Sequence, residues 1–382
     1  MNNSELFIGL MSGTSIDGID VALVEFNDSA CKLIASLEYP INPEIKSNLS
    51  NLSSARTSNN SLEFENRIEL MARMDVIMGH LFAEASLAIL EQEKINASEI
   101  KAIGSHGQTI RHRPNNKSPF TLQVGDANII AEKTGITTVA DFRRMDIAAG
   151  GQGAPLAPAF HNAILRSESE NRIILNLGGI ANITLLPKDQ NQPVIGFDTG
   201  TANTLLDVWF KKHHQESQDD FDRDANFANQ GEVSSTLLNQ LLSDPFFQIE
   251  HPKSTGREYF SLNWLIENIK ETNLIIKAED VQRTLIEFTT QSIADSIAKL
   301  EQTNFKVFTC GGGVHNQLLL DSLSEKLGIT VGKTNDLNVN GDYLEAMTFA
   351  WLAKQRLDEK PGNLSSVTGA RLEKVLGAVY SC

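Results

Sequence analysis

Hydrophobic and polar positions alternate near the start of the chain. An apolar run at residues 6–11 leads into a polar turn at Gly13, and residues 19–23 again alternate between apolar and polar or small side chains. A period of two on both sides of a short glycine turn is typical of a β-hairpin. We therefore predict a hairpin over residues 6–26. Residues 172–186 repeat this pattern and predict a second one.

Longer stretches have the period of an α-helix. Apolar side chains recur at spacings of three and four residues, which places them on one helical face. Helices are predicted at residues 61–93, 279–300, 316–327 and 343–357. Short apolar runs predict further strands at residues 100–103 and 306–309. Strands alternating with helices predict an α/β fold, and the repeated hairpin predicts two similar lobes.

The length of the chain supports the same division. The 382 residues, 41% of them hydrophobic and 21% charged, are more than one ordinary core accommodates and suit two domains. Residues 146–158 are rich in Gly, Ala and Pro and have no period, so we place the main boundary there. The first lobe is expected to hold residues 1–145 and 361–382, and the second lobe residues 146–360.

Charge and cysteine content limit the functional classes. The net charge of −15 disfavours nucleic acid and anionic membranes as partners, because both require a basic surface. The three cysteines are far apart and odd in number, so neither a disulfide framework nor a CxxC metal site is expected. No basic leader or run of ~20 apolar residues is recognisable. We expect a cytoplasmic protein.

Glycine turns suggest a nucleotide site. A polyphosphate is held by backbone amides that must approach closely, which glycine permits because it lacks a Cβ atom. Such turns lie at Gly13-Thr14-Ser15, flanked by Asp17 and Asp20, at Gly178-Gly179, followed by Asn182, and at Gly311-Gly312-Gly313. Each alone fits an ordinary glycine hairpin or tight strand-to-helix packing equally well. Three of them in this order at strand ends favour nucleotide binding.

Longer motifs carry a family resemblance. They are GLMSGTSIDGIDVAL at 9–23, GSHGQTIRH at 104–112, VADFRRMDIAAGGQGAPLAP at 139–158, NLGGIANIT at 176–184, GFDTGTAN at 196–203 and CGGGVHN at 310–316. Together they resemble the anhydro-N-acetylmuramic acid kinase family, part of the superfamily of sugar kinases, actin and heat-shock ATPases. The resemblance implies a two-lobed, actin-like ATPase (ribonuclease H-like) fold with the active site in the inter-lobe cleft. Thr201-Ala202 departs from the family, which usually has Pro-Gly there.

The resemblance also implies an activity. Family members phosphorylate 1,6-anhydro-N-acetylmuramic acid at its 6-oxygen with ATP and Mg²⁺, and water opens the anhydro bridge. The products are N-acetylmuramic acid 6-phosphate and ADP, in the recycling of cell-wall peptidoglycan. The partners implied are the small sugar and MgATP.

Matching positions give the candidate site residues. Asp198 is the implied catalytic base, and Glu345 is a second carboxylate near the substrate. The implied ATP-binding residues are Gly13, Thr14, Ser15, Ile16, Asp17, Gly18, Ile19, Asp20, Gly178, Gly179, Asn182, Gly311, Gly312 and Gly313. Asp17 and Asp20 are candidates to hold Mg²⁺ through water. The implied sugar-binding residues are His106, Gln108, Thr109, Asp141 and Arg143.

Structural roles compete with several of these assignments. Asp198 also fits an Asx-turn after a strand ending at Phe197. Glu345 also fits a capping box with Asp342, three residues before it. His106 fits a structural histidine equally well.

Other functions stay open on the sequence alone. One is a kinase of the same fold for another amino or acidic sugar, and another is a non-catalytic actin-like assembly or sugar-sensing module. The oligomeric state, including a homodimer, is also left open.

Overall fold

The chain forms two compact units. The computed structural model describes residues 4–13, 16–27, 31–53, 61–300 and 302–382, with the backbone alone for residues 61–65. Unit 1 comprises Met1–Ile164 with Tyr343–Cys382, and unit 2 comprises Leu165–Asp342.

Both predicted boundaries are therefore corrected. Residues 146–164 and 343–360 belong to unit 1, and the contacts of Asp146 give part of the reason. Its buried carboxylate accepts hydrogen bonds from Asn363 Nδ2 at 2.6 Å and Thr368 Oγ1 at 2.7 Å, both near the C-terminus. These bonds tie the predicted crossing segment to the end of the chain.

The sheet of unit 1 has the strand order β12-β6-β4-β1-β2-β3, and β5 pairs with β4. Strands β1, β2 and β3 form an antiparallel meander, whereas β4 runs parallel to β1 and β6 parallel to β4. The strands are β1 (Glu5–Ser12), β2 (Gly18–Phe26), β3 (Cys31–Pro40), β4 (Ile100–Arg113), β5 (Phe120–Val124), β6 (Thr138–Ala140) and β12 (Ala378–Tyr380). The first hairpin is confirmed, and β4 is longer than predicted.

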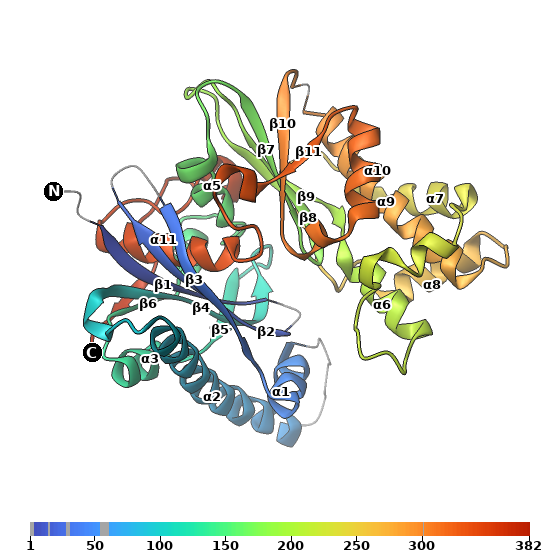
Figure 1. Ribbon diagram of the computed structural model, residues 1–382. Coiled ribbons are helices and arrows are strands. Elements are labelled where there is room, and N and C mark those ends of the chain that lie inside the picture. The colour runs from blue at the N-terminus through green and yellow to red at the C-terminus, as the bar shows by residue number, and fades with distance from the viewer. Residues whose placement is uncertain (1–3, 14–15, 28–30, 54–60, 301) are drawn as a thin grey trace. The chain divides into compact units, whose positions relative to one another are not determined.

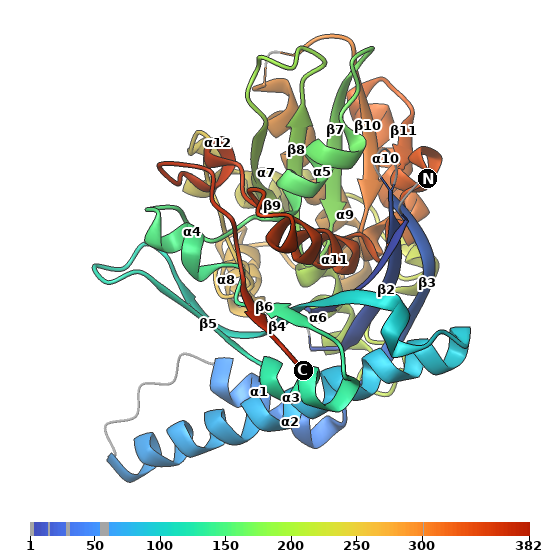
Figure 2. The same cartoon turned by 90° about the vertical axis from the view of Figure 1, so that its left-hand side faces the viewer.

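Helices cover both faces of this sheet. Helices α2 and α3 lie on one face and α11 on the other (Figure 1), and α1 packs beside α2 (Figure 2). The helices of unit 1 are α1 (Pro43–Ser53), α2 (Ser61–Glu93), α3 (Ala127–Thr134), α4 (Arg144–Ala148), α5 (Ala157–Leu165), α11 (Leu344–Leu357) and α12 (Ser365–Thr368), with the 3-10 turn η1 (Ala97–Glu99). The predicted helices at 61–93 and 343–357 are confirmed.

Two glycines let α11 lie directly on β1 and β4. A Cβ atom at Gly9 would overlap the carbonyl of Ala346 and come within 2.8 Å of the Ala350 nitrogen. A Cβ atom at Gly104 would overlap the carbonyl of Phe349. The backbone of the helix therefore rests where side chains would otherwise stand, which joins residues 343–357 to the first unit.

Unit 2 repeats the strand order. Its sheet runs β11-β10-β7-β8-β9, with β7, β8 and β9 as an antiparallel meander and β10 and β11 parallel to β7. The strands are β7 (Asn171–Leu177), β8 (Ile180–Leu186), β9 (Ile195–Thr201), β10 (Phe305–Cys310) and β11 (Val331–Lys333). This order matches β6-β4-β1-β2-β3 of unit 1, so the predicted duplication is confirmed. It is the ribonuclease H-like unit of the expected fold.

Helix α9 is the central helix of unit 2 and contacts β9, α6, α7 and α10 (Figure 1). Its buried side chains include Leu285, Phe288 and Ile293 on one face, as the period predicted. The helices are α6 (Asn203–His213), α7 (Ser235–Leu242), α8 (Leu262–Glu271), α9 (Ala278–Ala298) and α10 (Gln317–Leu327), with 3-10 turns η2 (Arg223–Ala225), η3 (Ala228–Gln230), η4 (Pro245–Gln248), η5 (Gly312–His315) and η6 (Thr334–Leu337).

The contact between Gly104 and α11 yields a stability prediction. Gly104→Ala should lower the free energy of unfolding by about 1–3 kcal/mol, the usual cost of overpacking a tight core contact. Gly178→Ala is the matched control, because the nearest atom to its added Cβ would be 3.6 Å away. Urea unfolding followed by circular dichroism measures both. Equal stability of the two variants would contradict the proposed packing of α11.

Candidate active site

The first glycine turn of unit 2 lies against the N-terminus of α6. The Gly178 carbonyl accepts a hydrogen bond from the Asn203 N–H at 3.0 Å, and the Gly179 carbonyl accepts from Ala202 at 2.9 Å and Thr204 at 3.1 Å. A Cβ at Gly179 would lie 2.8 Å from Thr204 Oγ1, whereas at Gly178 the nearest atom would be at 3.6 Å, an ordinary contact. A side chain at Gly179 would therefore displace neighbouring side chains, and one at Gly178 would not.

The same bonds bear on the departure from the family pattern. Thr201 pairs with Ile180 in β8, and the next residue, Ala202, donates its N–H to Gly179. Asn203 Nδ2 in addition donates to the Leu177 carbonyl at 2.9 Å. Asn203 is therefore anchored although Pro-Gly is absent.

The triple glycine combines packing with open space. Gly311 has a φ of +80°, and a Cβ there would contact the Asn176 side chain. A Cβ at Gly313 would lie 2.6 Å from Leu177 Cβ. At Gly312 the nearest atom would be Asn203 Nδ2 at 3.9 Å, and this glycine is exposed. Tight packing explains why residues 311 and 313 are glycines. It does not explain Gly312, where ligand binding is the remaining reason for a glycine.

Asp198 lies inside β9, not at its end as predicted, because the strand continues to Thr201 through pairing with β8. Its N–H donates to the Lys253 carbonyl at 3.0 Å, and its Oδ2 accepts from the Thr255 N–H at 2.9 Å. Burial raises the pKa of Asp198 to about 7, while the Thr255 N–H and the Lys253 charge oppose the rise. A carboxylate with a pKa near neutrality suits a general base.

Asn182, predicted to bind ATP with the glycine turn, lies in β8 beside this carboxylate. It pairs with Asp198 across β8 and β9, and with Asn176 across β7 and β8. Directly paired residues point to the same face of a sheet. Asn176, Asn182 and Asp198 therefore form a polar row on one face.

The hairpin turn of unit 1 is described in part. Thr14 and Ser15 lie outside the described residues. The Gly13 carbonyl accepts from the Ile16 N–H at 3.1 Å, and Ile16 adopts a φ of 60° with a buried side chain. Ile19 is also fully buried. The isoleucine side chains thus belong to the core, and only their backbone is available to a nucleotide.

The candidate magnesium residues flank this turn. Asp17 is exposed, and Gly18 and Asp20 belong to β2, where Gly18 pairs with Pro40. Among the described residues no three His, Cys, Asp or Glu side chains cluster as metal ligands. Mg²⁺ bound with nucleotide keeps several waters and uses phosphate oxygens, so it needs one or two carboxylates and no such cluster.

Gln108 supports the hairpin and does not point to a ligand. Its Oε1 accepts from Ser12 Oγ at 2.6 Å, and its Nε2 donates to the carbonyls of Gly13 at 3.2 Å and Thr109 at 3.3 Å. The residue is fully buried, and both of its amide hydrogens are used. This favours a structural role over the predicted sugar contact. Thr109 Oγ1 accepts from Gln123 Nε2 at 2.9 Å and is half-buried.

The side chains of His106 and Arg143 are hydrogen-bonded to each other. Arg143 approaches His106 Nε2 with Nε at 3.2 Å and Nη2 at 2.9 Å, and its Nη1 donates to the Gly153 carbonyl at 2.8 Å. His106 Nε2 therefore accepts, and burial with the adjacent guanidinium keeps its pKa well below the usual value, so the ring is neutral. His106 also packs on Phe349 with ring centres 4.7 Å apart. Two N–H groups of Arg143 remain for a ligand.

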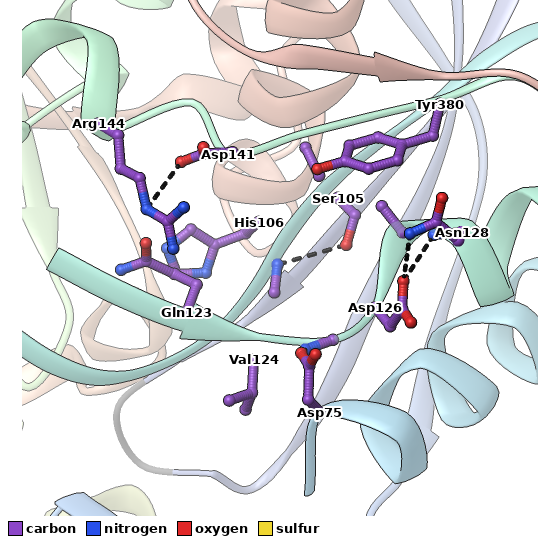
Figure 3. A pocket seen from close by; sticks show the side chains of 14 residues that line it. Asp75, Ser105, His106, Gln123, Val124, Asp126, Asn128, Asp141, Arg144 and Tyr380 are labelled. Carbon is purple, nitrogen blue, oxygen red and sulfur yellow. Dashed lines mark hydrogen bonds and ion pairs between the residues drawn. The ribbon is translucent and has the colours of Figure 1, made fainter. Parts of the chain in front are cut away.

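A polar pocket of about 310 Å³ lies beside His106 in unit 1 (Figure 3). Asp141, with a φ of 58°, forms an ion pair with Arg144 at 3.5 Å. Burial raises the pKa of Asp141, and Arg144 opposes the rise. The side chains drawn include Asp75, Ser105, His106, Gln123, Val124, Asp126, Asn128, Asp141, Arg144 and Tyr380.

Sequence reasoning found His106 and Asp141 of this pocket and missed most of the others. Asp126 carried a signal, because it caps α3 by accepting from the Asn128 N–H at 2.8 Å. Asp75 and Tyr380 reach the pocket from α2 and from the last strand, and no motif links them to it.

Glu345 is an exposed residue in the first turn of α11. The capping-box alternative is wrong, because the N-cap is Tyr343 and Asp342 instead pairs with His315 Nε2 at 2.9 Å. The Glu345 charge raises the pKa of Arg143, which burial lowers to about 10. The Glu345 carboxylate therefore favours the protonated form of Arg143, a candidate sugar-binding residue.

The described part of the chain contains no helix that meets the length and hydropathy of a membrane span.

Comparisons with known proteins identify the family of the chain. The family model for anhydro-N-acetylmuramic acid kinase matches residues 5–382. A curated protein of that name from Coxiella burnetii (strain Dugway 5J108-111) is 50% identical over 379 residues, covering 98% of this chain and 97% of its own. One from Xylella fastidiosa (strain Temecula1 / ATCC 700964) is 49% identical, covering 99% and 97%.

Similarity to solved structures is weaker. A ROK family glucokinase from Streptomyces griseus, in complex with glucose and AMPPNP, is 13% identical with a TM-score of 0.41, covering 92% of this chain and 99% of its own. An activator of 2-hydroxyisocaproyl-CoA dehydratase from Clostridium difficile is 14% identical with a TM-score of 0.45, covering 93% and 97%. These scores are too low to add to the sequence match.

The duplicated sheet defines the class of proteins with the actin-like, ribonuclease H-like fold. Within that class, the match over residues 5–382 decides the family. The chain belongs to the anhydro-N-acetylmuramic acid kinase family.

The open side of Gly312 yields a binding prediction. Gly312→Val should leave the folding free energy nearly unchanged but lower ATP affinity at least tenfold, because the branched side chain fills space that the fold leaves free. Gly313→Val is the contrasting variant and should unfold more easily. Calorimetric titration with an ATP analogue, together with thermal unfolding, measures both effects. Normal affinity in Gly312→Val would remove this turn from the nucleotide site.

Proposed function

We propose that the protein transfers the γ-phosphoryl group of ATP to the 6-oxygen of 1,6-anhydro-N-acetylmuramic acid while water opens the anhydro bridge. The products are N-acetylmuramic acid 6-phosphate and ADP. The observation that carries the proposal is Asp198, a half-buried carboxylate with a pKa of about 7 on the sheet that bears two glycine turns. Membership of the family supports the choice of sugar.

The reaction needs one base and no separate acid. The oxygen of water forms a bond to C1 as the C1–O6 bond breaks, and Asp198 takes the proton of that water. The 6-oxygen receives the phosphoryl group, and the bond from phosphorus to the bridging oxygen of ADP breaks. The phosphoryl group thus captures the departing oxygen in place of a proton.

Three turns are proposed to bind ATP. A Cβ would meet no atom closer than 3.6 Å at Gly178 and 3.9 Å at Gly312, and both glycines lie near Asn203, which favours close approach of a ligand to the backbone there. In unit 1 the hairpin residues Gly13, Thr14 and Ser15 complete the proposed set. Mg²⁺ would neutralise charge on the phosphates and be held through water by the two carboxylates that flank the hairpin turn.

The sugar is assigned to side chains of unit 1. The free N–H groups of Arg143 suit the lactyl carboxylate in a charge-assisted pair, and Thr109 and Asp141 suit hydroxyl and amide groups. His106 positions Arg143 through its Nε2 atom. We rank Glu345 second to Asp198 as a catalytic carboxylate, because it is exposed and Asp198 is not.

The proposed role fits peptidoglycan recycling in the cytoplasm, where ATP is available. An assay of ATP consumption with and without the anhydro-sugar tests it. Consumption that requires 1,6-anhydro-N-acetylmuramic acid supports the proposal. Equal or faster consumption with another amino sugar would replace it by a kinase of the same fold for that sugar.

Asp198→Asn should lower kcat at least ~100-fold, because general-base contributions are typically 10²- to 10⁴-fold. Both KM values should stay within about threefold, since the amide oxygen can still accept the Thr255 N–H. The wild-type kcat/KM should rise with pH to a plateau above about 7, because Asp198 must be deprotonated to act. The variant should lose this limb of the profile.

Two control variants separate the other carboxylates. Asp17→Asn should act mainly through the Mg²⁺ dependence of the rate, and Glu345→Gln should retain more activity than Asp198→Asn. Steady-state kinetics from pH 5 to 9 compare all three. If Asp198→Asn keeps more than a tenth of wild-type kcat while Glu345→Gln is inactive, Glu345 is the base.

A further inference from the structure

One short segment of unit 2 contacts both the catalytic carboxylate and a glycine turn. Residues 253–257 supply the Lys253 carbonyl and the Thr255 N–H that hold Asp198. Two residues further on, Arg257 reaches the turn at Gly179. A Cβ atom built at Gly179 would lie 2.9 Å from Arg257 Nη2 and 3.0 Å from its Nε.

The Arg257 guanidinium has no partner in the described part of the chain, where it forms neither a hydrogen bond nor an ion pair. The residue is exposed. Its neighbour Lys253 is engaged, because its Nζ donates to the Phe246 carbonyl at 3.2 Å and lies 4.4 Å from the centre of the Phe246 ring. Arg257 is thus a positive group of this segment that the described protein leaves uncompensated.

A second donor points to the same turn. Thr204 is 6% exposed, and its Oγ1 has no hydrogen-bond partner among the described residues. That oxygen would lie 2.8 Å from the Cβ atom built at Gly179. Thr204 stands in the first turn of α6, an 11-residue helix whose N-terminus carries partial positive charge. A buried hydroxyl normally finds a partner, so this one is available to a ligand.

A guanidinium and a buried hydroxyl suit an anion with several oxygens. The protein as a whole carries a net charge of −15, so a polyphosphate depends on such local groups. We propose that Arg257 is a catalytic residue that binds the transferring end of the ATP phosphate chain, with Thr204 as a second donor. This rests on the proposed kinase function. Arg257 forms no covalent bond, and its N–H groups stabilise charge on the phosphoryl oxygens as they leave ADP for the 6-oxygen.

The position of Arg257 also couples it to Asp198. The segment that holds Asp198, the proposed base for the attacking water, is the one that places the guanidinium at the Gly179 turn. The base and the phosphoryl-binding group are therefore connected through five residues of backbone. This arrangement would keep the base and the phosphoryl-binding group in register.

Arg257→Met tests the proposal in the full-length protein. The kcat at saturating substrates should fall at least ~100-fold, the scale for loss of a donor to a transition-state oxyanion. Affinity for AMPPNP should fall at least tenfold while affinity for AMP, which lacks the terminal phosphates, changes less than twofold. The melting temperature should not change, because the side chain is exposed and unpaired in the described part of the chain.

Three further variants sharpen the test. Arg257→Ala should regain activity when guanidinium is added, which a purely structural role would not permit. Thr204→Val, nearly the same in shape, should weaken AMPPNP more than AMP. Arg223→Met is the matched control, because Arg223 is an exposed arginine of the same unit already paired with Asp219 at 2.6 Å. It should bind and react like the wild type.

Two outcomes would overturn the proposal. One is unchanged kcat and AMPPNP affinity in Arg257→Met, and the other is an equal loss of AMPPNP and AMP affinity, which would indicate a general structural defect. Failure of the proposed function is distinguishable, because it would show as no sugar-dependent ATP consumption by the wild type. The comparison of AMPPNP with AMP tests Arg257 in that case too.

Discussion

The hydrogen bond from the Thr255 N–H to the Asp198 carboxylate is the interaction on which the proposed chemistry depends. β9 carries Asp198 into the sheet, where burial favours the neutral acid and raises its pKa to about 7. The Thr255 N–H and the Lys253 charge favour the anion and limit that rise. The balance leaves a carboxylate that is both oriented and able to accept a proton near neutral pH. Backbone groups of one segment hold Asp198 at two points. Its main-chain N–H donates to the Lys253 carbonyl, and its carboxylate accepts from the Thr255 N–H.

Glycines serve two separate purposes in this protein. Gly311 and Gly313 are required because strands and turns approach too closely for a Cβ atom, as Gly9 and Gly104 are required beneath α11. Gly312 faces open space, so the fold gives no reason for its lack of a side chain. A motif of three glycines therefore mixes packing and binding, and only the structure separates them.

The periodic parts of the fold were predictable, and the parts that depend on distant contacts were not. The amphipathic period gave α9 nearly to its ends, and the glycine-centred alternation located the hairpin of β1 and β2. The boundary between units was misplaced because α11 lies on β1 and β4, a contact that no local pattern reveals. Family motifs located Asp198, but its place inside β9 depends on pairing of Thr201 with β8. Arg257 was missed because the segment around it has no periodic pattern of hydrophobic residues. The hydrogen bonds of that segment to Asp198 also come from backbone groups, which leave no signal in the sequence.

The central claim is that water attacks C1 with Asp198 as base while the 6-oxygen receives the phosphoryl group. Turnover in water enriched in oxygen-18 tests it most directly, with the product analysed by mass spectrometry before its anomeric oxygen exchanges with solvent. We predict one labelled oxygen at C1 of the sugar product for each ADP formed, and no label in the phosphate ester. Label in inorganic phosphate, with unlabelled sugar, would mean simple ATP hydrolysis and would contradict the account.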